Sequence, residues 1–506
     1  MTLSTIQAKK SQFESLNTLM LVLVMLLVFF MSTRTPADPD MWWHLRAGEE
    51  TIAAGRPLTV DTMTFTRYGE KWVNHSWLAQ LVLVVAYKLG GPLGLSLYTA
   101  LMVTATMLVL YQSLKGGVFF KALIIFLTCL VVAPLWTPRP QQFSLLLFAG
   151  LNAWLGLYVQ RKTTKTWPLP LIFILWSNLH GGYSFGFMLL GITLVGLIFD
   201  RLFRPETTET LAWPEIGRLA DWTAISLLAV LINPNGLSTW TIPFQTVGVE
   251  LTNYIQEWES IDFHQLYSLP YLILLFACLI SIGLSNRRAT GAELFGLTLF
   301  GAISLAAQRL IGLFALFAAV VLANHAQAAL SMMGDHLRTT KFGERFIRWR
   351  NSRQQQPVAP GVRRGINLTM AALLAAAGII KLAYVSYPDL VNKALESYYP
   401  VSAVDYLEDY ETPGNLFSDY GWGGYLDFRL RDYKVFLDGR ADLYPDELFM
   451  AWLDATNAKP GWEETLATYD VQYILLPPEM KLVQEAQQAG WKVLYQDEIS
   501  VLLEPE

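Results

Sequence analysis

Apolar runs of about 18–22 residues recur along most of the chain, and this recurrence constrains the fold more than any other feature. As a helix, a run of that length crosses a hydrocarbon core of about 30 Å. Only 16% of the residues are charged, against about 25% in soluble domains. The sequence therefore predicts a polytopic α-helical membrane protein with about eleven transmembrane helices. The predicted spans are 16–33, 92–114, 118–136, 142–160, 168–179, 183–200, 221–233, 265–285, 290–307, 310–330 and 366–386.

A shorter apolar stretch covers residues 76–89. It is too short for a full crossing, so we expect a re-entrant or interface-lying helix. It belongs to a first external loop, residues 34–91, that also carries a second interface helix. The first apolar run lacks a small-x-small cleavage site, which predicts an uncleaved anchor rather than a signal peptide.

Basic residues indicate the orientation. With the N-terminus inside, the bases around Arg161, Arg204 and Arg287 fall in inner loops, and so does the strongly basic loop 335–364. Cytoplasmic loops carry an excess of Lys and Arg. We expect a multi-pass protein of the bacterial plasma membrane, with a cytoplasmic N-terminus and an extracytoplasmic C-terminal segment.

The C-terminal segment has a different composition from the transmembrane domain, residues 1–386. Residues 387–506 include 23 acidic and 8 basic residues, which argues against nucleic acid as a partner. Short strand-like runs alternate with helical ones, so we expect a soluble extracytoplasmic α/β domain. The expected strands are 415–418, 434–437, 471–476, 492–495 and 499–503, with helices at 445–455 and 478–489 among them.

The sequence offers little sign of a cofactor. Cys129 and Cys278 both lie within apolar runs, so neither a disulfide framework nor a CxxC site is expected. Neither a P-loop nor a GxGxxG motif beside a strand–helix unit is visible.

Asp38 and Asp40 lie where the chain leaves the first span. One carboxylate could take a proton from an acceptor hydroxyl or amine. The pair could also hold a divalent cation, Mg²⁺ or Mn²⁺, together with His44 or His75. The alternative for the aspartates is a polar loop that caps a helix. Interfacial packing beside tryptophans would explain the two histidines equally well.

Two arginines lie at expected external boundaries. Arg139 stands between two prolines, where a fixed guanidinium suits a phosphate, although it could instead extend toward lipid headgroups. Arg309 interrupts an apolar run, and it either marks a tight external turn or extends into a cavity. Both are candidate ligands of a donor phosphate.

Further polar residues lie at the same expected boundary: Gln142, His180 and Glu257. Polar side chains that enter lipid are costly and usually line a cavity or site. His180 precedes two glycines, which allow close backbone approach to a ligand but would equally end a helix. We take these residues, with His44 and His75, as candidates for a substrate cavity.

The C-terminal segment contains Asp438-Gly439-Arg440-Ala441-Asp442 directly after an expected strand. Asp438, Arg440 and Asp442 could bind a ligand at the edge of the sheet. They could also form an ordinary strand turn in which Asp438 and Arg440 pair locally.

One apolar span, a long external loop that opens with Asp38-x-Asp40, and many further spans resemble the GT-C superfamily of membrane glycosyltransferases. The segment DPDMWWHLRAGE, residues 38–49, resembles the start of a group of uncharacterised bacterial GT-C-like proteins. Their Trp-Val-Asn-His-x-Trp stretch and terminal Asp-Gly-Arg-x-Asp segment correspond here to residues 72–77 and 438–442.

The resemblance implies transfer of a sugar from a polyprenyl-phosphate donor to an unknown glycan, lipid or protein acceptor on the external face. It implies an inverting enzyme with Asp40, or Asp38, as the base, and Arg139 as a ligand of the lipid phosphate. The group itself has no defined chemistry, so the resemblance leaves sugar and acceptor open.

The sequence also allows two other functions, those of a transporter and of a noncatalytic scaffold. A transporter usually has its site near the bilayer midplane and carries internal repeats, whereas the polar residues here crowd one face. A noncatalytic scaffold would display the acidic external domain and would not need Asp40 or Arg139.

Overall fold

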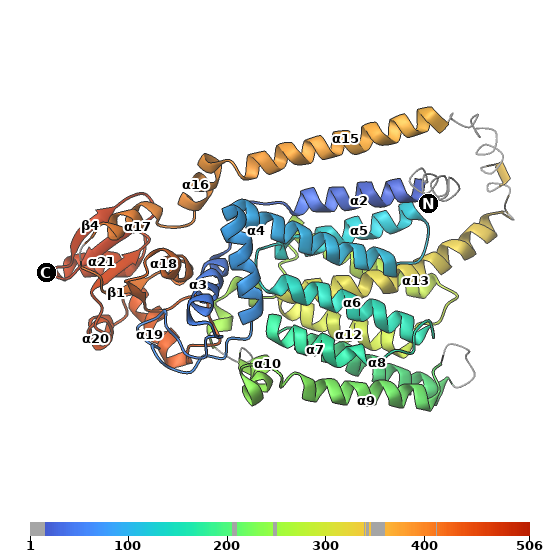
Figure 1. The fold of residues 1–506 in the computed structure, drawn as a ribbon, viewed down its shortest axis with the longest axis horizontal. Coiled ribbons are helices and arrows are strands. Elements are labelled where there is room, and N and C mark those ends of the chain that lie inside the picture. The colour runs from blue at the N-terminus through green and yellow to red at the C-terminus, as the bar shows by residue number, and fades with distance from the viewer. Residues whose placement is uncertain are drawn as a thin grey trace.

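The computed structural model of the chain describes residues 16–204, 210–245, 250–338, 340, 344–345, 360–410 and 412–506. Long helices lie side by side along the long axis of the molecule, and a small sheet stands at one end of them (Figure 1). We call this end of the helical bundle the domain end. Most of the predicted basic loop 335–364 lies outside the described residues.

The bundle consists of helices whose positions follow the apolar runs of the sequence. They are α2 (Leu16–Ser32), α4 (Trp77–Ser113), α5 (Val118–Val132), α6 (Gln141–Val159), α7 (Pro168–Leu179), α8 (Tyr183–Phe203), α9 (Trp213–Ala229), α11 (Leu269–Leu284), α12 (Gly291–Ala306), α13 (Ile311–Arg338) and α15 (Pro360–Val385).

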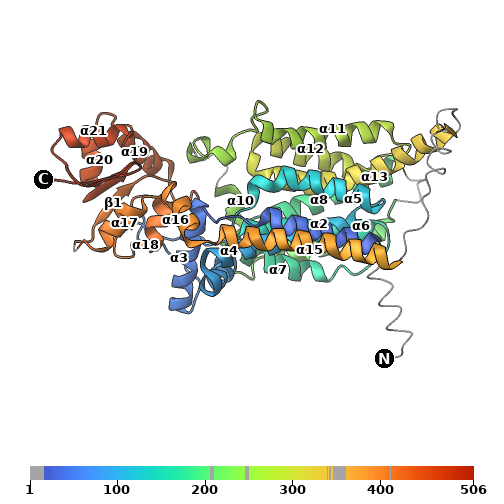
Figure 2. The ribbon, with the colours of Figure 1, turned by 90° about the horizontal axis from the view of Figure 1, so that it is seen from above.

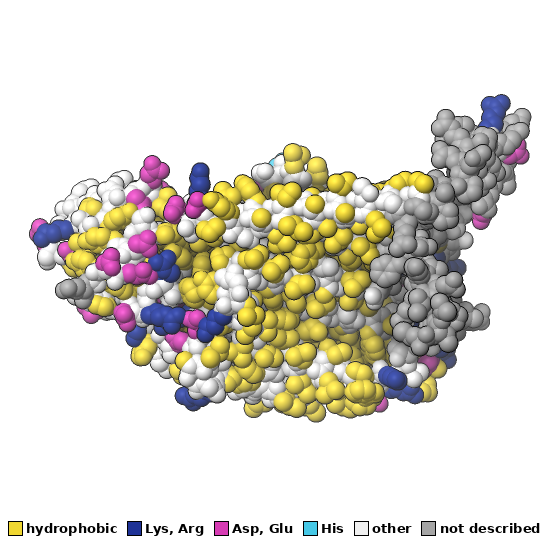
Figure 3. Space-filling view, turned by 45° about the horizontal axis from the view of Figure 1, so that its top comes forward, with side chains coloured by type: hydrophobic (Ala, Val, Ile, Leu, Met, Phe, Trp, Pro, Cys, Tyr) yellow, Lys and Arg dark blue, Asp and Glu magenta, His cyan; other side chains and the backbone are white. Residues whose placement is uncertain are grey.

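Seven of the helices in the described part of the chain are long and apolar enough to cross a membrane, and three shorter ones are also apolar. Apolar side chains cover the middle of the molecule in Figure 3, whereas charged side chains gather toward its two ends. The protein is therefore an integral membrane protein. The predicted number of eleven spans is not confirmed, because several helices are shorter than a full crossing.

Two predicted spans begin later than the helices that overlap them. Helix α9 starts at Trp213 rather than near 221, because Pro214 stands in its first turn and the Glu215 carboxylate accepts from the backbone N–H of Ala212. Helix α15 starts at Pro360 rather than near 366. Both helices begin with polar residues, so a search for apolar runs places their starts too late.

The short apolar stretch 76–89 is helical and continues into the next span as α4. Gly91 has φ 53° and ψ −136°, a conformation outside the helical region that glycine adopts at little cost. The chain turns there, so the first part of α4 stands across the domain end while the second part runs along the bundle (Figure 1).

The C-terminal part contains a sheet of five strands in the described residues, ordered β2-β1-β3-β5-β4. The strands are β1 (Asn415–Ser418), β2 (Lys434–Val435), β3 (Tyr473–Leu476), β4 (Lys492–Gln496) and β5 (Val501–Glu504). Strands β2, β1 and β3 run parallel, whereas β5 pairs antiparallel with β3 and β4. The helices around it are α16 (Pro388–Glu396), α17 (Val401–Glu408), α18 (Gly423–Arg429), α19 (Asp446–Thr456), α20 (Trp462–Thr468) and α21 (Lys481–Gln488).

The first loop and the C-terminal part share a core. Helix α3 (Pro39–Ala54) packs against α18. One buried cluster joins Trp43 and Trp72 to Phe436, and another joins Trp42 to Tyr399 and Tyr425. The loop thus connects the sheet to the bundle, and the division of the chain near residue 386 stays a prediction.

Candidate active site

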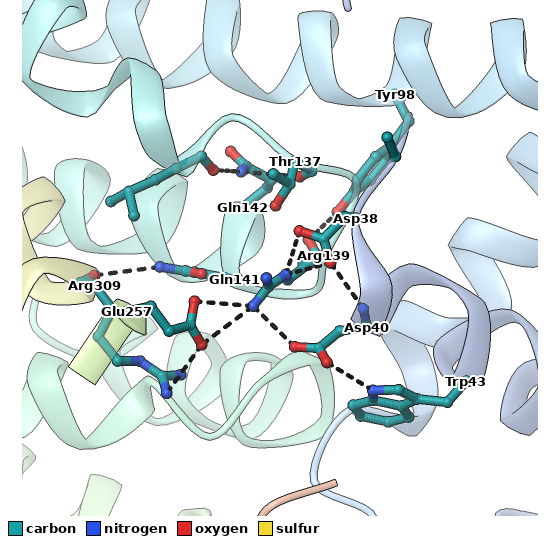
Figure 4. Close-up of polar contacts among 12 residues, drawn as sticks. Asp38, Asp40, Trp43, Tyr98, Thr137, Arg139, Gln141, Gln142, Glu257 and Arg309 are labelled. Atoms are coloured by element: carbon teal, nitrogen blue, oxygen red, sulfur yellow. Dashed lines mark hydrogen bonds and ion pairs between the residues drawn. The ribbon is translucent and has the colours of Figure 1, made fainter. Parts of the chain in front are cut away.

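Arg139 lies at the centre of an ion-pair cluster at the domain end (Figure 4). Its Nε lies 2.6 and 2.7 Å from the carboxylate oxygens of Asp38. Its Nη1 lies 2.9 Å from Oδ2 of Asp40 and 3.2 Å from Oε2 of Glu257. Burial acts to lower the pKa of Arg139, but the three carboxylates outweigh it and raise that pKa well above its ordinary value. The guanidinium is permanently charged.

A second arginine completes the ion-pair cluster from another part of the chain. Arg309 lies in the 3₁₀ turn Gln308–Leu310, and its Nη1 lies 3.5 Å from Oε1 of Glu257. Its guanidinium stacks over the Trp258 ring at 4.3 Å. Three carboxylates and two guanidiniums meet here, so the fully ionised cluster carries one excess negative charge.

The local sequence explains why these side chains are fixed. Asp38 caps α3, because its Oδ1 accepts the backbone N–H of Asp40 at 3.0 Å. The Arg139 carbonyl accepts the Tyr98 hydroxyl at 3.2 Å. Gln142, 1% exposed, donates to the carbonyls of Leu135 and Thr137 at 2.6 and 3.1 Å. Gln142 therefore holds the loop that carries Arg139.

Asp40 is partly buried and contacts Trp43. Its Oδ1 accepts from Nε1 of Trp43 at 3.2 Å, and its side chain is 23% exposed. Burial raises the pKa of Asp40 to about 7, with Asp38 and Glu257 adding to the rise and Arg139 opposing it. At Glu257 burial also acts to raise the pKa, but Arg139 and Arg309 outweigh it and lower that pKa. Environments that separate two carboxylates in this way suit one of them to proton transfer.

Three predicted histidines lie close to the ion-pair cluster and are neutral. Burial lowers the pKa of each. The His44 ring stacks against Trp43 at 3.5 Å, and its Nδ1 lies 3.3 Å from the amide nitrogen of Gln80. The rings of His75 and His180 are 5.8 Å apart, and Nδ1 of His180 lies 2.7 Å from the Ser144 hydroxyl and accepts from Gly182.

The segment 438–442 covers the ion-pair cluster from the C-terminal part. Arg440 is fully buried, pairs with both oxygens of Asp438 and lies 2.7 Å from Asp61 of the first loop. Its guanidinium also stacks over Trp72 at 4.6 Å. Because the buried charges are paired, removing one of them would leave another uncompensated. The arrangement fastens the segment 438–442 to the first loop.

Asp442 faces His75 rather than Arg440. Its Oδ2 lies 3.8 Å from Nδ1 of His75, beyond hydrogen-bond distance, and both atoms are buried without a partner.

Two cavities reach the ion-pair cluster at different residues. The first, of about 360 Å³, is lined mainly by apolar side chains, including Val131, Leu135 and Ile311, and has Glu257 and Arg309 at its polar end. The second, of about 600 Å³, is more polar and reaches Asp38. Gln256 lines both. Because Arg139 bridges Asp38 and Glu257, it stands between the cavities.

The residues do not fit the divalent metal considered for Asp38, Asp40 and His44. The Arg139 guanidinium fills the place between the carboxylates, and a cation beside it would be repelled. His44 contacts Trp43 and Gln80 instead. The described residues contain no group of three or more His, Cys, Asp or Glu side chains arranged to hold a metal ion.

Sequence reasoning missed Asp61 and Gly439. A Cβ at Gly439 would lie 2.2 Å from Oδ1 of Asp40, so the backbone there touches the proposed base. The sequence points to Asp61 only indirectly: a buried arginine such as Arg440 requires acidic partners. No local pattern identifies which acid supplies that partner.

Comparisons with known proteins place the fold. No protein-family model matches the chain, and no curated protein does. The oligosaccharyltransferase of Archaeoglobus fulgidus, in its form tethered to an acceptor peptide, superposes with a TM-score of 0.52 at 12% identity, over 90% of this chain and 68% of that one. The same organism's AglB, in complex with an inhibitory peptide and a dolichol-phosphate, gives 0.51 at 13% identity, over 90% and 69%. ArnT from Cupriavidus metallidurans aligns more loosely, with a TM-score of 0.47 at 16% identity over 96% of each chain. The chain thus has the fold of the GT-C membrane glycosyltransferases.

Proposed function

We propose that this protein transfers a sugar from a polyprenyl-phosphate donor to an acceptor at the domain end, with Asp40 as general base. The observation that carries the proposal is the geometry of Asp40. Its carboxylate has a pKa of about 7 and is held by Arg139, which also pairs with Glu257 of the first cavity and Asp38 of the second. A fold alone does not define a reaction, so the argument depends on this site.

The first cavity suits a lipid donor. Its walls are apolar over most of their surface, and Arg309 lies at the end next to the ion-pair cluster. A polyprenyl chain would pack against Val131, Leu135 and Ile311, and the phosphate would lie near Arg309. The AglB structure contains a dolichol-phosphate, and this likeness supports a lipid-phosphate donor here.

The proposed reaction is a single displacement. Asp40 accepts the proton of an acceptor O–H or N–H group as that atom attacks the anomeric carbon of the donor sugar. The bond between that carbon and the phosphate oxygen breaks, and the electron pair leaves with the lipid phosphate. Arg309 stabilises the negative charge that develops on the phosphate. One displacement inverts the anomeric configuration.

In this proposal Arg139 positions the carboxylates and does not bind the donor phosphate. It is already paired with three carboxylates, and it therefore positions Asp40 and Glu257. Arg309 pairs with only one carboxylate of the cluster, Glu257. Its guanidinium is therefore better placed to bind a phosphate.

The proposed orientation puts the domain end outside the cell. Arg161, Arg204 and Arg287 belong to the opposite end, where they pair with Glu215, Asp200 and Glu293 respectively. The positive-inside rule then favours a cytoplasmic opposite end. With this orientation the sheet domain is extracytoplasmic, and the proposed location is a bacterial plasma membrane.

The direct test is donor consumption. Purified protein in nanodiscs would receive a panel of polyprenyl-phosphate sugars with membrane extract as the acceptor source, and released polyprenyl phosphate would be measured. We expect release from at least one donor, and product of inverted anomeric configuration. No release from any donor, with the protein folded, would refute the proposal.

A further inference from the structure

The second cavity has donor groups that nothing described so far uses. Its lining includes Arg34, Asp38, Ser96, Thr99, Trp136 and Thr137. At about 600 Å³ it is large enough for a small polar ligand group. Its wall carries hydroxyls and one cation, in contrast to the apolar wall of the first cavity.

Trp136 supplies an unsatisfied donor. Its side chain is buried, with 2% of the residue exposed, and its indole Nε1 has no hydrogen-bond partner. A buried donor without a partner costs about 1–3 kcal/mol, so native proteins usually pair such groups with a side chain, water or ligand.

Arg34 stands over the same ring. Its guanidinium lies 5.3 Å from the centroid of Trp136, and Nη1 donates to the carbonyl of Ala133 at 3.0 Å. The Arg34 backbone N–H donates to the Ser96 hydroxyl at 3.2 Å, which fixes the start of the side chain. The guanidinium is thus oriented, and its remaining N–H groups are available to a ligand.

The surroundings favour an anion. The acid in the wall, Asp38, is already paired with Arg139 at 2.6 Å. A second cation comes from α15, where the Lys381 ammonium donates to the carbonyls of Phe30 and Met31, shortly before Arg34 in the sequence. Figure 2 shows α15 beside α2 along the bundle, so this cation stays next to the cavity.

We propose that the second cavity binds a phosphate group of the acceptor, with Arg34 and the Nε1–H of Trp136 as its ligands. This proposal rests on the proposed function, because the ligand is the acceptor only if the protein transfers a sugar. A planar guanidinium matches phosphate geometry, and the indole N–H adds a directed donor. The phosphate-bearing acceptor reaches Asp38 on one side of Arg139 while the donor lies on the other.

The test measures binding without turnover. The purified full chain in maltoside detergent, carrying Asp40→Asn to prevent transfer, would be titrated with dodecyl phosphate and separately with inorganic phosphate. Arg34→Gln, which removes the charge, is expected to raise the Kd of dodecyl phosphate about tenfold or more. Trp136→Phe, which keeps an aromatic ring but loses the N–H, should weaken binding by a smaller factor. Arg56→Gln removes an exposed charge from the first loop and should leave the Kd unchanged.

The outcomes separate the two proposals. Binding of dodecyl phosphate alone, dependent on Arg34, supports a lipid headgroup, whereas equal dependence for inorganic phosphate supports a soluble phosphorylated acceptor. Binding that depends on Arg309 and not on Arg34, or no binding of either probe, would overturn the inference. Because no transfer is measured, a failed transfer assay would refute only the proposed function and would leave the phosphate site standing.

Discussion

The backbone of Gly439 closes directly on the carboxylate of Asp40, with only 2.2 Å between Oδ1 and the place where a Cβ would stand. Residue 439 belongs to the C-terminal part, and residue 40 lies in the first turn of α3 in the first loop. The proposed base is therefore held by two distant segments. The neighbouring buried pairs of Arg440 with Asp438 and Asp61 fasten that contact.

A methyl group at Gly439 should displace Asp40. We expect Gly439→Ala to lower kcat/KM about 100-fold, because misplacing a catalytic group by about 1 Å can cost that much. Gly150→Ala is the matched control, since a Cβ there meets nothing within 4 Å. Equal rates for the two variants at equal melting temperatures would contradict the role given to this contact.

The pH dependence of activity should follow Asp40. A base must be deprotonated, and the pKa of Asp40 is about 7. Below that value kcat/KM is expected to rise about tenfold per pH unit, and to level off above it. The measurement is initial rate against pH at low donor concentration. A rate that is flat between pH 5 and 8, values about two units below and one above the pKa, would argue for another base.

Arg139 should matter for stability as well as rate. Arg139→Gln leaves three carboxylates without their shared cation, and breaking a buried pair in this way costs about 3–5 kcal/mol. We expect a markedly lower melting temperature in detergent. Arg161→Gln is the control, because its side chain is 45% exposed in its pair with Glu215 and such a pair is worth at most about 1 kcal/mol.

Chelation should leave transfer unchanged. The guanidinium of Arg139 occupies the place between Asp38 and Asp40 that a divalent ion would need. Activity after dialysis against EDTA is therefore expected to equal activity with added Mg²⁺ or Mn²⁺. Loss on dialysis, with recovery on adding one of the metals, would show that Arg139 moves aside to admit an ion.

Much of the bundle could be predicted from the sequence because apolar length and helix-ending residues act locally. The span 168–179 matches α7, which has Pro168 at its start and His180 after its end. Strand β1 also matches its predicted range, 415–418. Helix α9 was misplaced because its first turns, from Trp213, are polar and capped by Glu215 rather than apolar.

The candidate site was only partly accessible to such reasoning. Asp40, Arg139, Glu257 and Arg309 could be grouped because they follow or precede spans at one end. Their pairing, the approach of Gly439 and the partner of Arg440 depend on packing between segments hundreds of residues apart. The unpartnered Nε1 of Trp136 is likewise a property of the folded chain, since any interfacial tryptophan looks the same in sequence.

The central claim is that Asp40 accepts the proton in a transfer from a lipid-phosphate sugar. Its most direct test compares Asp40→Asn with Asp432→Asn, which changes an exposed carboxylate of the C-terminal part, in release of polyprenyl phosphate from the active donor. The account predicts a loss of about 10²–10⁴-fold for Asp40→Asn, the usual contribution of general base catalysis, and no change for Asp432→Asn. Equal release by the two variants, both folded, would contradict it.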